Sequence, residues 1–447
     1  MASLITGLIK ALGPDIYPKL VAFDLDGTTW DGWLNEHEFG KKGWVTEGKK
    51  EDNVTLLKMN NDGFLIGDVK NPKYKAAQVL VPYDFIKILQ DIRKQTKPNS
   101  SDNMNIDVCI SSKNTHKDMC VRALWHVEYD DPKRGKGTRV TDIIKYFEAG
   151  NEHQPKTEHF DNFERWNQDK GRPTSQKKML LFDDKAENMD VEQWNGVTFF
   201  KIAKPGRGMT YDDYKNGLKL YRSFMEWRRY IPASGADSSK VQHIGYVGAD
   251  MLNAQRYAEG KRRTRTDRAA RWGYAMYVAD DPRIAAFFSK MGREGTPDDQ
   301  YIVKLYVRSS QAFDFINKVW YPSKGSWQIN NVHSTMEQTC QAQEKLDKKV
   351  MEKFNVSKPY LSFSKHGKMA GMDWIKDGTR FNEMIVYPQI QDAMFFGEAH
   401  KLSEVEGLIN SGDANWPHLK WHRNIKPWGI KLCAETKADF DKYGERY

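Results

Sequence analysis

Three short apolar runs stand out in the first half of the chain, and polar residues follow each of them at once. They cover residues 20–23, 106–110 and 179–182. The first run is continuously apolar, which is typical of a strand that is buried in a parallel sheet. The pattern therefore predicts an α/β domain with polar side chains at the ends of its strands.

A polar insert from Trp33 to Ala77 separates the first two runs. Within it, residues 53–57 and 63–67 flank the turn sequence Asn60-Asn61-Asp62, a combination that predicts a β-hairpin. A hairpin is too small to form a full cap over the ends of the strands. We therefore expect any pocket there to be open.

The middle of the chain predicts a helix and then a linker. Residues 214–230 carry aromatic and aliphatic side chains at helical spacing, and residues 232–240 have the proline, serine and glycine content of a linker. A chain of 447 residues is too long for a single core. We expect a first domain over 1–215, a connecting helix and linker over 216–240, and a second domain over 241–447.

The second domain mixes strands and helices. Apolar strands are predicted at 243–250 and 274–279, and a helix follows that carries residues 285–288. A long polar helix over 337–354 and a late strand over 380–387 complete the pattern. These elements predict a second α/β unit.

Composition is that of an ordinary globular protein. Hydrophobic residues make up 39% and charged residues 29% of the chain, and no apolar run approaches the length of a membrane span. The four cysteines lack paired or metal-ligand spacing, which favours a reducing compartment. Leu4 to Leu12 is short and lacks a small-residue cleavage site, so no secretory signal is expected. We expect a cytoplasmic protein, with the nucleus as the alternative.

A net charge of +9 makes an anionic partner plausible. Basic residues are densest between Arg262 and Arg271, and the nearby Trp272 and Tyr274 offer surfaces on which bases can stack. Nucleic acid is therefore one candidate partner for this run. The alternative is a solvated basic face.

The strongest chemical signal is the pair Asp24 and Asp26 at the end of the first strand. Gly27 follows, which lets the chain turn sharply. Asp24 can attack a phosphoryl group as a nucleophile, while Asp26 donates a proton to the leaving oxygen and later activates water. Because two anions repel a phosphate, a hard cation such as Mg²⁺ must lie between them.

These residues, with the two later strands, make the first half resemble the haloacid dehalogenase superfamily and its small magnesium-dependent phosphatases. The resemblance runs from about Lys19 to Lys201. It implies a doubly wound parallel sheet and hydrolysis of a phosphorylated substrate at an open site. Open sites in this fold suit bulky substrates such as phosphoproteins or nucleic-acid ends.

The resemblance also assigns roles to later residues. Ser112, rather than Ser111, matches the hydroxyl that hydrogen-bonds the transferred phosphoryl group, and Lys113 follows it. Asp183 and Asp184 match the paired acids that hold magnesium. The metal site implied in this way comprises Asp24, Asp26 through its backbone carbonyl, Asp183 and Asp184.

The family also places a basic residue beside the aspartyl-phosphate, usually a lysine at a helix start. Alignment on residues 140–144 puts Arg139 there. Arginine carries the charge as a planar fork, so it does not replace lysine on equal terms. The alternative for Arg139 is a solvated basic turn.

The second half resembles the diphtheria-toxin-type ADP-ribosyltransferases, from His243 to about Pro388. In that family a strand ends near a tyrosine, an acidic turn follows, and a helix returns a second aromatic ring. Tyr277 and Phe288 match these two positions. The resemblance implies a smaller, mixed α/β split-sheet domain that holds the nicotinamide ring of NAD between aromatic faces.

A carboxylate and a first motif complete this resemblance. Glu383 matches the acid that stabilises positive charge on the ribose as nicotinamide leaves, and Tyr246 belongs to the first NAD-binding motif. This chain departs from the pattern at Val247, where the family usually has His or Arg, because valine donates no hydrogen bond. Members of the wider family that modify arginine carry Gln or Glu two residues before the catalytic acid. This chain has Phe381 at that position, which disfavours modification of arginine. The alternative is a non-catalytic module that binds an anionic partner.

Overall fold

The computed structural model of the chain divides into two compact units, residues 1–222 and 223–447, and each is described by itself. The division falls inside the predicted connecting helix. The structure describes residues 17–34, 54–68, 73, 78–95, 105–231, 241–264, 272–291, 293, 296–329, 335–367, 369–374, 380–442, 444 and 446–447. The predicted linker 232–240 and residues 265–271 of the basic run lie outside this range.

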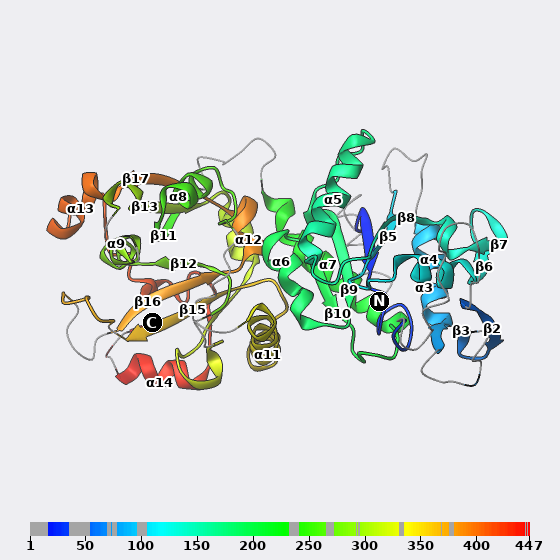
Figure 1. The fold of residues 1–447 in the computed structure, drawn as a ribbon. Helices are drawn as coiled ribbons and strands as arrows, with labels where there is room; N and C mark the ends of the chain where they lie inside the picture. Colours follow the sequence, from blue (N-terminus) through cyan, green and yellow to red (C-terminus); the bar gives the residue numbers. More distant parts are fainter. Residues whose placement is uncertain are drawn as a thin grey trace. The chain divides into compact units, whose positions relative to one another are not determined.

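The first unit is built on a five-stranded parallel sheet with the order β10-β9-β1-β5-β8. The three predicted strands are confirmed and lie side by side in its centre (Figure 1). Its strands are β1 (Leu20–Phe23), β5 (Asp107–Ser111), β8 (Ile144–Glu148), β9 (Met179–Asp183) and β10 (Thr198–Lys201).

Aromatic packing joins this sheet to its helices. Phe23 on β1 stacks on its register partner Phe182 on β9, and the edge of Phe23 meets Phe85. Gly217 lies so close to Phe182 that a Cβ there would be 2.3 Å from the ring. The helices of this unit are α3 (Tyr83–Gln95), α4 (Lys117–Trp125), α5 (Lys156–Asp169), α6 (Asp190–Trp194) and α7 (Tyr211–Glu226), which crosses the division between the units.

The predicted hairpin is confirmed as β2 (Val54–Asn60) and β3 (Gly63–Asp68), which pair antiparallel. The side-chain oxygen of Asn60 accepts hydrogen bonds from the backbone N–H groups of Asp62 and Gly63, which fixes the turn. A third strand, β4 (Gln78–Pro82), extends the hairpin to a three-stranded sheet. A separate ribbon pairs β6 (Glu128–Asp131) with β7 (Gly135–Arg139).

The second unit contains one mixed eight-stranded sheet with the order β17-β13-β11-β12-β16-β15-β14-β18. Its narrowest junction lies between β11 and β12, which share a single register pair, Tyr246 with Ala279. The split-sheet arrangement stays a prediction. The strands are β11 (Gln242–Ala249), β12 (Met276–Ala279), β13 (Tyr301–Val307), β14 (Asn317–Trp320), β15 (Tyr360–Gly367), β16 (Arg380–Val386), β17 (Phe395–Lys401) and β18 (Lys431–Leu432).

Helices cover this sheet and include the predicted polar helix. In Figure 1, α8 lies over β13 and β17, and α9 lies against β11. None of the helices among the described residues is both long and apolar enough to cross a bilayer. The helices are α8 (Met251–Ala258), α9 (Pro282–Lys290), α10 (Ser310–Phe315), α11 (Met336–Phe354), α12 (Pro388–Met394), α13 (Leu402–Ser411) and α14 (Ala434–Lys442).

Candidate functional site

The central strands of the first unit bring three predicted site residues to one edge of the sheet. Phe23 pairs in register with Ile110 on β5 and with Phe182 on β9. The residues that follow them at this edge are therefore Asp24, Ser111 with Ser112, and Asp183. Parallel strands place their carboxyl ends together, which is why residues more than 150 positions apart meet here.

Asp24, Asp183 and Asp184 form a buried acidic cluster, whose ligand oxygens all lie within 4.8 Å of one another. Burial raises the pKa of Asp24 to about 7 and that of Asp184 to about 6, and the charge of Asp183 adds to both increases. Three carboxylates this close require cationic compensation.

Two features of the cluster fit a hard cation. Among the described residues, no donor reaches the buried Oδ1 of Asp184 or the buried Oδ1 of Asn188. Gly27 has a φ of +72°, and a Cβ there would lie 2.6 Å from Oδ2 of Asp184, so glycine makes room for this carboxylate. Unpaired oxygens on carboxylate and amide groups are the ligands that Mg²⁺ takes. The donor set therefore fits the predicted magnesium.

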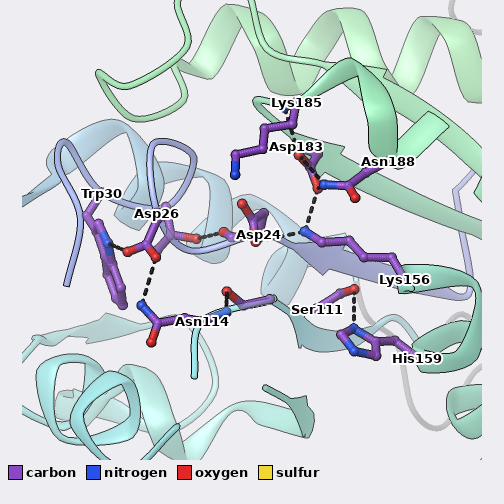
Figure 2. A network of polar contacts seen from close by, with 12 residues as sticks. Asp24, Asp26, Trp30, Ser111, Asn114, Lys156, His159, Asp183, Lys185 and Asn188 are labelled. Carbon is purple, nitrogen blue, oxygen red and sulfur yellow. Dashed lines mark hydrogen bonds and ion pairs between the residues drawn. The ribbon is translucent and has the colours of Figure 1, made fainter. Parts of the chain in front are cut away.

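Lys156 is the cation that contacts this cluster. Its Nζ lies 2.7 Å from Oδ1 of Asp24 and 2.5 Å from Oδ2 of Asp183, and its side chain is only 1% exposed. Burial alone would lower the pKa of Lys156, but Asp183 and Asp24 raise it above its ordinary value. Figure 2 shows its ammonium group between the two carboxylates.

Arg139, which the sequence placed in this role, lies elsewhere. Its Nε is 3.3 Å from Glu128 and its guanidinium stacks on the ring of Trp125 at 3.5 Å. Arg139 ends β7, and the ribbon of β6 and β7 directs it to this pair. A signal for Lys156 was available in Pro155-Lys156-Thr157, because proline before a helix marks its start.

Three donors hold the carboxylate of Asp26, and two of them, Trp30 and Asn114, are shown in Figure 2. Its Oδ1 accepts hydrogen bonds from the indole Nε1 of Trp30 at 2.9 Å and from the backbone N–H of Leu34 at 3.0 Å. Its Oδ2 accepts one from the side-chain amide of Asn114 at 2.7 Å. These bonds fix the carboxylate of Asp26, and the acidic side chains that cluster nearby are Asp24, Asp183 and Asp184. Binding of the metal by the carbonyl of Asp26 stays a prediction.

Ser112 is buried at the end of β5, where its hydroxyl oxygen accepts a hydrogen bond from the backbone N–H of Asn114 at 3.2 Å. Its own hydroxyl proton remains available to a ligand. Lys113 lies beside it and is partly exposed. Ser111 instead pairs with Nδ1 of His159 at 3.0 Å, and burial lowers the pKa of His159 to about 3. The neutral imidazole thus holds Ser111.

The second unit contains a cavity of about 470 Å³. The structure brings Tyr277, Phe288 and Glu383 together on its wall, although they come from β12, α9 and β16. Two of the departures from the family pattern, Val247 and Phe381, also line it. The described segments therefore assemble most of the second predicted site in one place.

Tyr246 is the exception, because it does not line the cavity. Its ring is fully buried, stacks on Trp416, and its hydroxyl donates to the carbonyl of Pro417 at 2.9 Å. Successive side chains of a strand point to opposite faces. Because Val247 faces the cavity, Tyr246 faces the other side of the sheet.

Sequence reasoning missed His366, which lies in this cavity. Its Nε2 is 2.9 Å from Oε2 of Glu383, and both side chains are less than one tenth exposed. The edge of Trp272 meets the imidazole at 4.4 Å between ring centres, and Phe381 stacks on it at 5.3 Å. His366 comes near Glu383 through the pairing of β15 with β16, which cannot be read from the sequence without knowing the order of the strands in the sheet.

Comparison with known proteins finds likenesses for the first unit. The Acid Phosphatase family matches residues 16–224. A "HAD-like hydrolase superfamily protein P8B7.31" of Schizosaccharomyces pombe is 27% identical over 188 residues, which cover 42% of this chain and 87% of that protein. The resemblance of the N-terminal half to haloacid dehalogenase-type hydrolases is therefore confirmed.

A solved structure also aligns with the chain. It is the N-terminal part of the protein BF1531 from Bacteroides fragilis, containing a phosphatase domain complexed with Mg, and it is 18% identical with a TM-score of 0.26. The alignment covers 50% of this chain and 44% of the other. The chain thus spans less than half of that protein's length.

Proposed function

We propose that the first unit is a Mg²⁺-dependent phosphomonoesterase that works through an aspartyl-phosphate on Asp24. The observation that carries this proposal is the contact of Asp24 with both Lys156 and the acids Asp183 and Asp184. The match to the Acid Phosphatase family supports the same reaction class.

Asp24, Asp183 and Asp184 would hold the ion. Bound there, Mg²⁺ offsets the negative charge of the cluster and polarises the phosphoryl oxygens of the substrate. Ser112 donates its hydroxyl proton to one phosphoryl oxygen, and Lys113 adds positive charge at the entrance. Lys156 holds Oδ1 of Asp24, which leaves Oδ2 to react.

The reaction has two balanced steps. In the first, Oδ2 of Asp24 forms a bond to phosphorus, the ester P–O bond breaks, and Asp26 donates a proton to the leaving alcohol. In the second, Asp26 takes a proton from water, the resulting oxygen attacks phosphorus, and the bond to Asp24 breaks to release inorganic phosphate. The donors on Asp26 hold it in position for both transfers.

The substrate we infer is bulky, such as a phosphorylated protein side chain or a nucleic-acid end. Within the part of the insert that the structure describes, a small sheet of β2, β3 and β4 stands in the place of a cap. Trp33 is 60% exposed at this end of the unit, and Nζ of Lys185 lies 5.8 Å from its ring centre. An exposed ring beside a cation gives an extended substrate a surface to contact.

The test is Asp24→Asn with a generic aryl phosphate in the presence of Mg²⁺. Loss of the nucleophile should reduce turnover at least about 1000-fold. Asp62→Asn, in the exposed turn between β2 and β3, is the matched control and should keep full activity. Unchanged turnover by the Asp24 variant would remove this residue from the mechanism.

For the second unit, we propose an ADP-ribosyltransferase-like use of NAD: transfer of ADP-ribose or hydrolysis of NAD. The favouring observation is the cavity that places Tyr277 and Phe288 beside the Glu383–His366 pair. Glu383 would stabilise positive charge on the ribose as nicotinamide leaves, and the aromatic rings would hold nicotinamide. Together the two units would make the chain bifunctional.

Release of nicotinamide from labelled NAD tests this second function. The wild-type chain should release it and Glu383→Gln should not. No release by the wild type would instead favour a non-catalytic module that binds nucleic acid or another anion through the run Arg262 to Arg271. Steeply salt-dependent binding of nucleic acid would then support that alternative.

A further inference from the structure

The cavity of the second unit contains a cationic group whose hydrogen bonds are incomplete. Arg263 lines this cavity, and its Nη1 donates to the carbonyl of Ala275 at 2.8 Å. Its Nε is buried, and no acceptor among the described residues reaches it. A buried donor on a charged group that lacks a partner is costly, so such a group invites a ligand.

The backbone around Arg263 is fixed by consecutive contacts. The carbonyl of Arg262 accepts a hydrogen bond from Nε of Arg256 at 2.6 Å, and the N–H of Arg263 donates to Gln391 at 3.2 Å. The N–H of Thr264 donates to the side chain of Asn253 at 2.7 Å. The guanidinium is therefore held in one place beside the start of β12, as a binding site requires.

The other arginine of the cavity is already occupied. Arg293 donates from Nη1 to the carbonyls of Ser289 and Phe288 at the end of α9, at 2.8 and 3.3 Å. Its guanidinium also lies 3.6 Å from Asp250 and 3.8 Å from Asp299. Of the two arginines in the cavity wall, Arg263 is the one with a donor to offer.

We propose that Arg263 binds the phosphate groups of a nucleotide in this cavity through its guanidinium group. Arginine presents a planar fork that matches two phosphoryl oxygens at once. Tyr277, Phe288 and Trp272 supply aromatic surface for a planar ring in the same cavity.

The inference rests on the proposed use of the cavity for a nucleotide, but it does not require cleavage of NAD. The probes are ADP-ribose, which carries a diphosphate, and adenosine, which carries none. Calorimetry with the full chain should show that Arg263→Gln weakens ADP-ribose binding about 10- to 100-fold. Adenosine binding should change less than about 3-fold, because neutral adenosine makes no salt bridge with the guanidinium.

Two further variants keep the test decisive. Arg263→Lys retains the charge but loses the fork, and it should weaken ADP-ribose binding by an intermediate factor. Arg423→Gln removes one exposed arginine outside the cavity and should leave binding unchanged. Melting temperatures close to that of the wild type would exclude misfolding of the Arg263 variants.

The outcomes separate this inference from the cleavage reaction. Equal affinity of Arg263→Gln and wild type for ADP-ribose would overturn the role of Arg263, even if nicotinamide is released from NAD. Loss of affinity in this variant without nicotinamide release by the wild type would support the phosphate site and reject the cleavage. Failure of the wild type to bind ADP-ribose would overturn the inference.

Discussion

The two candidate sites of this chain solve different electrostatic problems. In the first unit, Asp24, Asp183 and Asp184 lie within 4.8 Å of one another around the buried Lys156. In the second, Glu383 pairs with His366 in a wall rich in aromatic rings that also holds Asp250, Arg263 and Arg293. The first site has excess negative charge that a metal ion can offset, whereas the second mixes acidic and basic side chains.

This difference teaches what each site requires from the rest of the fold. A buried cluster of like charges is stable only while one cation stays in contact with it, so the loss of a few atoms can destabilise it strongly. A cavity built from rings depends on shape, which many contacts share. Substitutions should therefore have larger and more local effects in the first unit.

The largest expected effect is that of Lys156→Met. Removal of the ammonium group leaves Asp24 and Asp183 buried without their cation, which should cost about 3 to 5 kcal/mol of unfolding free energy when Mg²⁺ is chelated. Phosphatase turnover should fall with it. Denaturant unfolding with EDTA and with Mg²⁺ measures the effect, and added Mg²⁺ should restore part of the stability.

Arg139→Gln is the control for this prediction. Because Arg139 contacts Glu128 and Trp125 at a partly exposed site, its loss should change stability by less than about 1 kcal/mol and leave turnover intact. If Arg139→Gln abolished turnover while Lys156→Met kept it, the assignment of the cation would be reversed.

Two glycines give a smaller, matched effect in the two units. A Cβ at Gly27 would meet Asp184 at 2.6 Å, and a Cβ at Gly248, in the wall of the second cavity, would meet the carbonyl of Ala285 at 2.1 Å. Alanine at either position should destabilise its unit by about 1 to 3 kcal/mol. Only Gly27→Ala should raise the Mg²⁺ concentration needed for half-maximal phosphatase turnover.

Gly407→Ala serves as the reference, since a Cβ there meets no atom within 4 Å in helix α13. It should stabilise the chain by about 0.5 to 1 kcal/mol. If Gly27→Ala and Gly248→Ala needed the same Mg²⁺ concentration for half-maximal turnover, Gly27 would have no part in shaping the metal site.

The smallest effect concerns pH and the second unit. His418 lies 3.3 Å from the buried Asp280. Burial alone would lower the pKa of His418, but the hydrogen bond and charge of Asp280 raise it above 6.5. This pair should stabilise the fold fully below about pH 6.5 and lose that contribution as the pH rises through the raised value.

Because the side chain of His418 is 41% exposed, we expect the contribution to stay below about 1 kcal/mol. The measurement is the difference in unfolding free energy between wild type and His418→Asn from pH 5.5 to 9. A difference that grows with pH would contradict the sign.

Much of the first unit could be predicted from sequence because its strands carry continuous local signals. Leu20–Phe23 and the acids after it define a buried strand and its reactive end without any knowledge of neighbours. Pro155 marks the start of the helix at Lys156, but it does not reveal the role of this lysine, because the distance from Lys156 to Asp24 depends on how α5 packs. The alignment with Arg139 failed because local basic residues do not reveal which one faces the site.

In the second unit, the sequence pattern predicted fewer of the residues that line the cavity. Tyr277 and Phe288 lie in the predicted cavity because a short turn links their elements. Tyr246 does not line this cavity but its neighbour Val247 does, because successive residues of a strand face opposite sides of the sheet. The contact of His366 with Glu383 depends on the pairing between β15 and β16. The position of Arg263 depends on a hydrogen bond from its backbone N–H to Gln391, which lies far along the chain.

The most direct test of the central claim is mass spectrometry of enzyme quenched in acid during turnover of an aryl phosphate. We predict a phosphoryl group on the peptide that contains Asp24, formed with Mg²⁺ and absent when Mg²⁺ is chelated. A phosphoryl group on any other side chain, with Asp24 unmodified during turnover, would contradict the account.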